Sequence, residues 1–177
     1  MIKNCDGTVQ ISPVSQPDLE PISRLARDIW YLHYPGIITV SQIDYMLAQR
    51  YSPDVIASQI AAQDAWWDKV EAGSFLAGFA CYEPGSDTAS VKLDKLYVHP
   101  KVQGCGLGYA LVQHVEARSR DRGFSVLYLQ VNKGNTASIA FYRRAGFDIT
   151  NKLKVDIGNG YVMDDFVMSK RIGDNVG

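Results

Sequence analysis

A run of closely spaced glycines is the first feature of this sequence that could do chemistry. Gln103-Gly104-Cys105-Gly106-Leu107-Gly108 lies between an expected strand and an expected helix. Glycines let backbone N–H groups approach a ligand without interference from a Cβ atom, and the first turn of a helix carries partial positive charge. Together these features predict an anion site of the kind that suits a pyrophosphate group.

Three other interpretations of the glycines compete with this one. A dinucleotide-binding turn has Gly-x-Gly-x-x-Gly directly behind a strand and an acid about 20 residues later. Here the glycines begin well past Val98, and the next expected strand ends in Gln130-Val131-Asn132, without an acid. A Walker A loop needs Gly-Lys-Ser/Thr, whereas Tyr109-Ala110 follows Gly108. A merely flexible loop stays open on the glycine pattern alone.

A second motif lies downstream of the glycine loop and gives it a context. The stretch KLDKLYVHPKVQGCGLGYALV, followed by NTASIAFYRRAGF, resembles the GNAT superfamily of N-acetyltransferases, and somewhat its bacterial polyamine- or diamine-acetylating branch. The family's acyl-CoA loop, Gln/Arg-x-x-Gly-x-Gly/Ala, is matched by Gln103, Gly106 and Gly108. Its second motif, Asn-x-x-Ala/Ser-x-x-Phe/Leu-Tyr, is matched by Asn135, Ser138, Phe141 and Tyr142.

The resemblance implies acetyl-CoA as acyl donor. The strands at 91–98 and 126–131 are expected to splay apart, so that the pantetheine arm enters the gap and pairs with main-chain groups of one strand. The loop amides would hold the pyrophosphate, and the second helix would contact the cofactor. The implied cofactor-binding residues are Leu96, Tyr97 and Val98 in the strand, Gln103, Gly104, Cys105, Gly106, Leu107, Gly108 and Tyr109 in the loop, and Asn135, Ser138 and Tyr142 in the helix.

The implied reaction is direct attack of an amine on the thioester. A lysine-type amine has a pKa of about 10.4 and is mostly charged at neutral pH, so a base must take its proton. An acid should also meet the departing thiolate. Tyr142 matches the family's thiolate-facing tyrosine and is predicted to be this acid. The alternative is that Tyr142 is a core aromatic beside Phe141.

The base is expected on or near the strand at 91–98. Strand alternation predicts one face with Lys92, Asp94, Leu96 and Val98, and the other face with Leu93, Lys95 and Tyr97. Several members of the resembled family carry an acid or a histidine at a position matching Lys92 or Asp94, so Asp94 is the predicted base. Glu83 acting through water is the second choice. A structural ion pair between Asp94 and Lys92 is the alternative to any catalytic role.

The acceptor site is the part that the sequence determines least. The resemblance implies that the early helices and the last strands wall it, and aromatic and acidic groups together suit a cationic amine. We therefore expect a small-molecule amine as substrate, although each candidate could equally be structural. The predicted substrate-binding residues are Tyr34, Gln42, Tyr45 and Glu83, with Tyr31 and His33 as further candidates and Asp164-Asp165 approaching from the far side.

The charge distribution agrees with a cofactor site in one half of the chain and an acceptor site in the other. The net charge of −1 argues against a general nucleic-acid binder. Residues 1–88 carry five Lys/Arg against eleven Asp/Glu, a net charge of −6, whereas residues 89–177 carry thirteen against eight, a net charge of +5. A basic half suits a polyanionic cofactor and an acidic half suits a cationic acceptor, although charges spread over solvated faces would give the same count.

Other features narrow the class of protein. Cys5, Cys81 and Cys105 are scattered and odd in number, which predicts a cytoplasmic chain without disulfides. No run approaches the roughly 18 apolar residues of a membrane helix, and MIKNCDGTVQ lacks the order of a signal peptide. No membrane association is expected. No Cys/His/carboxylate cluster has ligand spacing, so no metal is expected.

The expected elements describe one mixed α/β domain over 1–177, with an acyl-CoA-binding core at about 89–147. The resemblance implies the GNAT acyl-CoA N-acyltransferase fold: a central, mixed but mostly antiparallel sheet, splayed between its fourth and fifth strands and flanked by helices. Hydrophobic periodicity and Gly/Pro boundaries predict strands at about 8–14, 66–71, 74–83, 91–98, 126–131, 147–157 and 161–169, and helices at about 17–34, 41–50, 53–63, 107–122 and 135–145.

Three hypotheses for function stay open from the sequence. The first is an acetyltransferase acting on a small amine in a ternary complex with acetyl-CoA. The second is a protein acetyltransferase acting on an N-terminal amine or a lysine, which would favour an open groove. The third is a catalytically silent acyl-CoA-binding regulatory module. A homodimer is compatible with all three.

Overall fold

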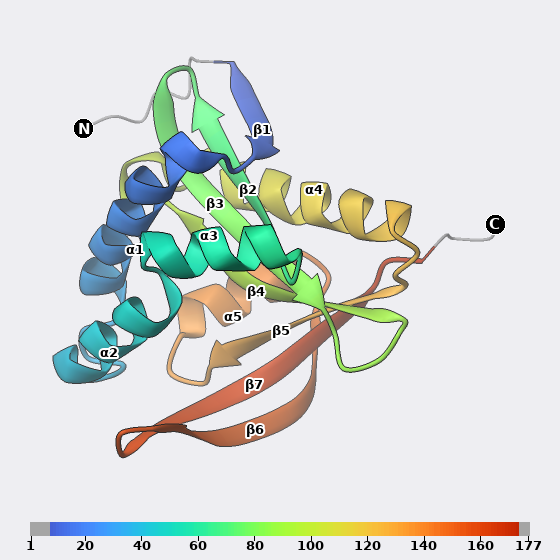
Figure 1. The fold of residues 1–177 in the computed structure, drawn as a ribbon. Coiled ribbons are helices and arrows are strands. Elements are labelled where there is room, and N and C mark those ends of the chain that lie inside the picture. The colour runs from blue at the N-terminus through green and yellow to red at the C-terminus, as the bar shows by residue number, and fades with distance from the viewer. Residues whose placement is uncertain (1–7, 174–177) are drawn as a thin grey trace.

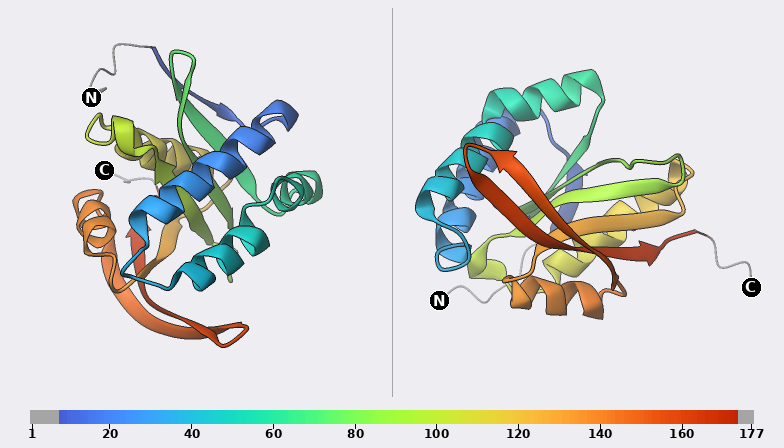
Figure 2. Two further views of the ribbon diagram at one scale, coloured as in Figure 1. Left: turned by 90° about the vertical axis from the view of Figure 1, so that its left-hand side faces the viewer. Right: turned by 90° about the horizontal axis from the view of Figure 1, so that it is seen from below.

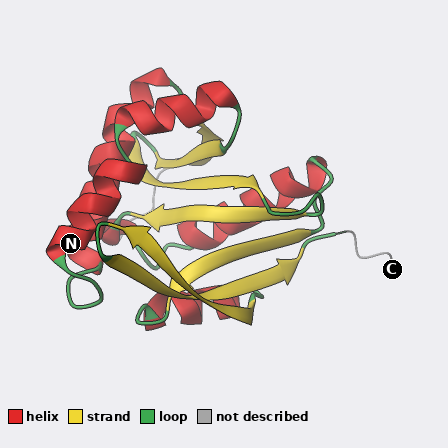
Figure 3. Cartoon of the chain, turned by 60° about the horizontal axis from the view of Figure 1, so that its bottom comes forward, coloured by secondary structure: helices red, strands yellow, loops and turns green. Residues whose placement is uncertain are grey.

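The computed structural model describes residues 8–173, which form one seven-stranded sheet with helices on both sides (Figures 1 and 3). The strand order is β1-β2-β3-β4-β5-β7-β6. The strands are β1 Val9–Pro13, β2 Trp66–Ala72, β3 Phe75–Pro84, β4 Ser90–Val98, β5 Val126–Asn132, β6 Asp148–Gly158 and β7 Tyr161–Arg171. The helices are α1 Leu19–His33, α2 Val40–Arg50, α3 Pro53–Ala62, α4 Leu107–Asp121 and α5 Thr136–Arg144, with short 3-10 turns at Gln16–Asp18 and Pro100–Val102.

Within residues 8–173, β4 and β5 are the one parallel pair of neighbouring strands, and these two strands diverge from each other. β4 pairs with β5 from Ser90↔Val126 to Leu93↔Leu129, and the register ends there. Beyond this point β4 continues along β3 to Val98, while β5 continues along β7 to Asn132. The other strand pairs are antiparallel. The predicted mixed sheet, splayed between its fourth and fifth strands, is therefore confirmed.

Two hydrophobic clusters fix the helices to opposite faces of the sheet. One joins α1, α2 and α3 to Trp67 and Phe79, which point from β2 and β3 to the same side. The other joins Leu111 and Val115 of α4 to the opposite face, and side chains of α5 pack against it. In the left view of Figure 2, α1 crosses in front of the sheet and α4 lies behind it. The gap between β4 and β5 thus lies between two helical layers.

An irregularity in β4 changes the expected alternation of its side chains. Cys81 is paired with Lys95 and Tyr82 with Leu93, so Asp94 is an extra residue, a β-bulge. Leu93 consequently packs on the α4 side together with Leu96 and Val98. Tyr97 packs on the α1 side. The prediction that Leu93 shares a face with Lys95 and Tyr97 is wrong, because one added residue inverts the period-2 pattern.

The predicted elements are otherwise found close to their expected bounds. The first helix begins at Leu19 rather than at Pro17, because residues Gln16–Asp18 form a 3-10 turn in which Asp18 accepts from the backbone N–H and the hydroxyl of Ser15. The predicted N-cap at Ser52 is confirmed, since its Oγ accepts from Val55 N. No helix among residues 8–173 is long and apolar enough to cross a membrane.

Candidate acetyl-transfer site

A cavity of about 170 Å³ lies where β4 and β5 diverge. Residues from α1, α2, β4, β5, α5 and β7 line it, so segments far apart in the sequence meet there. The cavity brings together the predicted site residues Tyr34, Asp94, Leu96, Tyr97, Val98, Gln103, Asn135, Ser138 and Tyr142. Lys92, Arg50, Asn132, Met163 and Asp165 also line it.

The β4 wall of the cavity is an unpaired strand edge. After Leu93 no strand of the described residues 8–173 pairs with the side of β4 that faced β5, since the β4–β5 register ends there. Such an edge can accept an extended ligand as an added strand. Leu96 and Val98, predicted to pair with the pantetheine arm, lie on this stretch. The Gln103 side chain donates to the Val98 carbonyl at 3.3 Å and connects the edge to the glycine loop.

The glycine loop leads into α4 in a conformation that depends on glycine. Gly104 and Gly106 have φ angles of +88° and +78°, in the left-handed region that disfavours residues with a Cβ. Gly106 is the N-cap of α4, and no side chain in the described part of the chain caps this end of the helix. The first amides of α4 are therefore available to an anion, where the helix dipole favours negative charge.

Gly108 has a different role from the other loop glycines. A Cβ built there would lie 3.3 Å from the Phe141 ring and 3.7 Å from the Val98 side chain. The small residue therefore lets the first turn of α4 approach α5 and the end of β4. This close packing holds the uncapped helix end next to the unpaired edge of β4.

The second motif forms the start of α5. Asn135 is the N-cap, and its Oδ1 accepts from Ser138 N at 3.1 Å. The two residues that were predicted to contact the cofactor thus contact each other and face the same cavity. Asn135 is buried, so it also fixes the position at which α5 begins.

Tyr142 lies on α5 and lines the cavity, with its ring against Phe141 and Phe147. Burial, together with the nearby Tyr34, raises the pKa of Tyr142 well above its usual range. The phenol is therefore protonated at neutral pH and can donate a hydrogen bond to a nearby anion. The ring of Tyr142 packs in the core cluster while the residue faces the cavity, so its position is compatible both with a core aromatic and with the predicted acid.

Asp94 is held by three cations. Arg50 Nη2 lies 2.6 Å from both carboxylate oxygens, Lys92 Nζ lies 2.8 Å from Oδ1, and Lys95 forms a further ion pair with Oδ2. Although burial opposes ionisation of Asp94, Lys95, Arg50 and Lys92 together hold its pKa well below its usual range. A carboxylate with so little proton affinity is a poor general base. The structural ion-pair alternative describes these contacts better than the predicted role as base.

A group of neutral phenols lines the helix side of the cavity. Tyr51 OH donates to Tyr97 OH at 3.2 Å, and the hydroxyls of Tyr97 and Tyr34 are 3.4 Å apart. Trp30 packs against the rings of all three. Burial raises the pKa of each of these tyrosines. The side chain of Tyr97 therefore lies on the helix side of the cavity, whereas its main chain belongs to the β4 edge.

Asp165 lies on β7 and lines the cavity. Its side chain is buried, and Oδ1 has no hydrogen-bond partner among residues 8–173. Burial and the neighbouring Asp164 raise its pKa to about 6, against the opposing influence of Lys133, Lys92 and Arg50. The sequence analysis placed Asp164-Asp165 only in general terms, as approaching the acceptor site from the far side.

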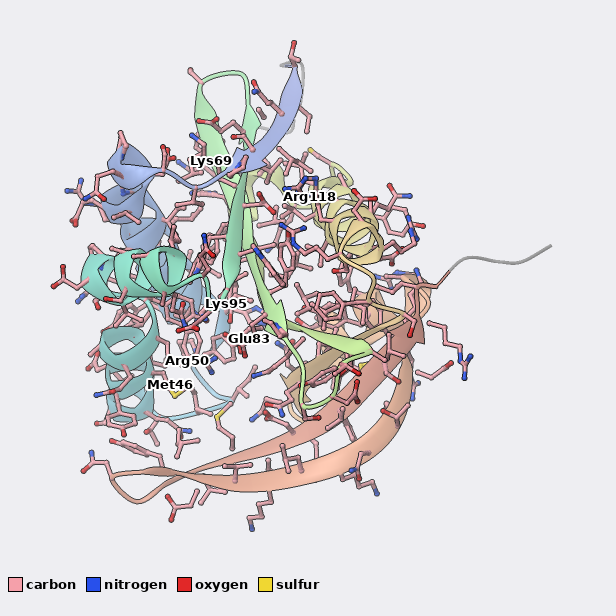
Figure 4. All side chains as sticks on the ribbon, turned by 45° about the vertical axis from the view of Figure 1, so that its right-hand side comes forward. Met46, Arg50, Lys69, Glu83, Lys95 and Arg118 are labelled. Atoms are coloured by element: carbon pink, nitrogen blue, oxygen red, sulfur yellow. The ribbon has the colours of Figure 1, made fainter. Side chains whose placement is uncertain are left out.

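Of the other predicted acceptor residues, His33 lines the cavity, whereas Gln42, Tyr45 and Glu83 do not. Gln42 Nε2 donates to Val162 O at 3.4 Å, and Tyr45 OH donates to Ile157 O at 3.1 Å, so both attach α2 to the β6–β7 hairpin (Figure 1). Glu83 pairs with Lys92 at 3.5 Å. Figure 4 labels Glu83 on the sheet. Contact of Gln42, Tyr45 or Glu83 with the acceptor stays a prediction.

Two further expectations concern cysteines and metals. Cys105 is disulfide-bonded, so the expectation of a chain without disulfides is wrong. Spacing along the sequence does not reveal which thiols the fold brings together. Cys5 lies outside the described residues, and the cytoplasmic location, which rested partly on this expectation, stays an expectation. Within residues 8–173, no group of three or more His, Cys, Asp or Glu side chains is placed to hold a metal ion.

Comparison with known proteins places these features in a family. The sequence model of the acetyltransferase (GNAT) family matches residues 26–147. A spermidine N(1)-acetyltransferase from Thermoplasma acidophilum is 26% identical over 168 residues, which cover 93% of this chain and 98% of that protein.

Solved structures share the fold. A PaiA N-acetyltransferase from Thermoplasma acidophilum in complex with coenzyme A has a TM-score of 0.79 at 24% identity, covering 93% of this chain and 99% of that one. A ribosomal-protein-S18-alanine N-acetyltransferase from Escherichia coli has a TM-score of 0.68 at 21% identity, covering 94% and 96%. Since the matched region contains both the glycine loop and the Asn135–Tyr142 motif, this chain belongs to the acetyltransferase (GNAT) family, as its two motifs predict.

Proposed function

We propose that this protein transfers the acetyl group of acetyl-CoA to a primary amine of a small cationic molecule, by direct attack in a ternary complex. The observation that carries the proposal is the cavity between the diverging strands, which holds both Tyr142 and an unpartnered carboxylate. Acetyl-CoA supplies a thioester whose carbonyl carbon an amine can attack. The residues of this chain must then bind the donor, orient the amine and handle its protons.

The donor half of the proposal rests on two adjacent features. The unpaired edge of β4 offers main-chain groups to the pantetheine arm, and the uncapped start of α4 offers amides to the pyrophosphate. Gln103 and Gly108 hold these two features next to each other. Such a site fixes the thioester near the open end of the gap, where Tyr142 faces the cavity. Its phenol is placed to donate a hydrogen bond to the thiolate as the carbon–sulfur bond breaks.

The acceptor half of the proposal rests on size and charge. The cavity is small, and the β6–β7 hairpin is attached to α2 on its acceptor side through Gln42 and Tyr45. Such closure suits a small molecule better than a protein segment. Aromatic rings and a carboxylate together suit an ammonium group. The relative named as a spermidine N(1)-acetyltransferase supports an amine of this class.

The decisive experiment is a thiol-release assay with acetyl-CoA and four groups of acceptors: polyamines, aminoglycosides, amino acids and peptides. We expect turnover with small alkyl amines and little with peptides. Turnover confined to peptides would instead favour a protein N-terminal or lysine acetyltransferase. Tight binding of acetyl-CoA without turnover on any amine would favour a silent acyl-CoA-binding module.

A further inference from the structure

Asp165 is a buried carboxylate that the fold leaves without a counter-charge. It is 6% exposed, and its Oδ1 has no hydrogen-bond partner among the described residues. β7 pairs with β5 at Asp165↔Asn132, three residues beyond Leu129, where the register of β5 with β4 ends. Asn132 and Asp165 both line the cavity that Tyr142 faces. A buried polar atom without a partner is costly, so one that faces a cavity calls for a ligand.

The cations near Asp165 are all engaged with other carboxylates. Lys133 pairs with Asp164, whose side chain is 52% exposed. Lys92 pairs with Asp94 and Glu83, and Arg50 pairs with Asp94. No ion pair of Asp165 occurs within residues 8–173. An ammonium group entering the cavity would therefore be the first cation to pair with it.

We propose that Asp165 binds the ammonium group of the acceptor amine and takes its proton before attack. This inference rests on the proposed function, and it assigns to β7 the base that the sequence had suggested on β4. Asp94 is unsuited to the role because three cations already hold it, and Glu83 because it pairs with Lys92 outside the cavity lining. Asp165 combines a position in the cavity with a free oxygen.

The proton steps balance as follows. The Asp165 carboxylate removes a proton from R–NH3+, which leaves R–NH2 and a neutral carboxyl. The nitrogen lone pair forms the C–N bond, and the electrons of the C–S bond leave with sulfur. Sulfur takes a proton from the Tyr142 phenol, whose oxygen receives the proton that nitrogen loses. The net change is R–NH3+ and acetyl-S-CoA to R–NH–acetyl, CoA-SH and a proton, which leaves Asp165 for solvent.

The charges around Asp165 suit this exchange. Burial and Asp164 on the same strand raise its pKa to about 6, while Lys133 beside α5, Lys92 on β4 and Arg50 on α2 act in the opposite direction. The neutral phenol of Tyr34 lies on the helix side. Relative to an ordinary carboxyl, proton affinity is greater by roughly 100-fold, yet the group is still ionised at neutral pH. It can therefore attract the ammonium and accept its proton.

The test uses steady-state rates against pH with n-butylamine and spermidine as acceptors. We expect kcat/KM of the wild-type protein to fall below about pH 6. Asp165→Asn should abolish this limb and lower kcat/KM by about 100-fold or more, as loss of a general base does. Asp148→Asn on β6, an exposed carboxylate outside the cavity lining, is the control and should keep both the rate and the position of the limb.

Two measurements make the outcome independent of turnover and of folding. The first is the affinity of the CoA-saturated protein for spermidine, which Asp165→Asn should lower about tenfold or more while CoA affinity is unchanged. The second is a carbon NMR titration of the wild-type protein labelled at aspartate carboxyls, which should show one carboxyl titrating near pH 6. Addition of spermidine should move this titration to lower pH, because a bound ammonium favours the ionised carboxyl, and an unmoved titration would overturn the inference even if Asp165→Asn fails to fold.

The inference and the proposed function fail in different ways. An active Asp165→Asn variant with an unchanged limb would overturn the role of Asp165 and leave the proposed function in place. Absence of amine acetylation by the wild-type protein would overturn the proposed function. In that case, equal spermidine affinity of wild type and Asp165→Asn would overturn the inference as well, and a selective loss of affinity would support amine binding at Asp165.

Discussion

Arg50 on α2 reaches across to the β-bulge of β4 and places one guanidinium nitrogen 2.6 Å from both carboxylate oxygens of Asp94. The side chain of Asp94 is 3% exposed. The helix layer on one side of the cavity is therefore attached to the strand whose edge lines the same cavity. Lys92 and Lys95 of β4 complete the ion-pair group. Figure 4 shows Arg50 and Lys95 near each other between the helices and the sheet.

Asp94→Asn tests this attachment. Removing the carboxylate leaves three cations without their partner, two of them on the same strand, so we expect the free energy of unfolding to fall by about 3–5 kcal/mol. The pKa of Asp94 is held far below its value in the unfolded chain, so its contribution is fully present above about pH 4 and declines at lower pH. Urea denaturation at pH 7 measures the loss.

The same variant separates stability from catalysis. Since Asp94 stays ionised throughout the working range of pH, we expect the acidic limb of kcat/KM to keep its position in Asp94→Asn, measured at a temperature where the variant is folded. A limb that disappears in this variant would restore Asp94 as the general base. The double variant Arg50→Met with Asp94→Asn leaves one cation fewer without its partner, so it should lose less stability than Asp94→Asn alone.

The sequence predicted the fold well wherever local pattern determines structure. The glycine at 73 marks the turn between β2 and β3, and Ser52 with Pro53 marks the start of α3. The two motifs also placed the start of α4 and α5 at one end of the gap. These features depend on residues close together in the chain, such as a cap or a positive φ angle, so a single sequence is enough to recognise them.

The proton chemistry could not be predicted in the same way. Strand alternation assigned a face to Asp94, but a bulge is set by the register with β3 and inverted that pattern. Whether a carboxylate is free depends on which cations the fold brings near it. Asp94 forms an ion pair with Arg50 from a separate helix, whereas Asp165 forms no ion pair within residues 8–173, because the cations near it pair with other carboxylates. Such pairings depend on tertiary contacts, so the sequence could identify the candidate carboxylates but not which of them pair with cations.

Tyr142→Phe tests whether the Tyr142 phenol is the general acid. Removal of the hydroxyl leaves the ring and its packing against Phe141 and Phe147 in place. We expect kcat to fall by about 100-fold, the usual size for loss of a general acid, with little change in acetyl-CoA affinity. Tyr128→Phe on β5, outside the cavity lining, is the control and should retain activity. A wild-type kcat in Tyr142→Phe would remove this phenol from the mechanism.

Gly106→Ala tests the anion site at the start of α4. The φ angle of +78° at this N-cap costs a residue with a Cβ about 1–2 kcal/mol, although no atom obstructs the Cβ itself. We expect the loop to change conformation and the KM for acetyl-CoA to rise about tenfold, equivalent to about 1.4 kcal/mol, with kcat little altered.

Gly123→Ala provides the matched control for the loop variant. Gly123 follows the other end of α4, has a φ angle of +86° and equally open space at its Cβ, so the backbone strain is the same. We expect it to lose similar stability in thermal unfolding while keeping the KM for acetyl-CoA. An equal rise of KM in both variants would mean that Gly106 acts through stability rather than through the anion site.

Asp165 also predicts how stability depends on pH. Its pKa is raised to about 6 in the folded protein, against about 3.9 in the unfolded chain. Between these values the folded protein binds the proton more tightly, so the contribution of this group to the free energy of unfolding falls as pH rises from about 4 to about 6. Above that range the buried, unpaired carboxylate destabilises the protein without its ligand.

Asp165→Asn should therefore stabilise the protein while inactivating it. A tenfold change in a protonation equilibrium corresponds to about 1.4 kcal/mol, so we expect the variant to gain about 1–3 kcal/mol over wild type at pH 8 and much less at pH 4.5. Urea denaturation at the two pH values measures the difference, and Asp164→Asn, on an exposed ion pair, should change stability by less than about 1 kcal/mol. If Asp165→Asn instead loses more stability relative to wild type at pH 8 than at pH 4.5, the fold stabilises the Asp165 carboxylate. Since sites that bind charge are often kept at the expense of stability, the expected gain is itself a mark of function.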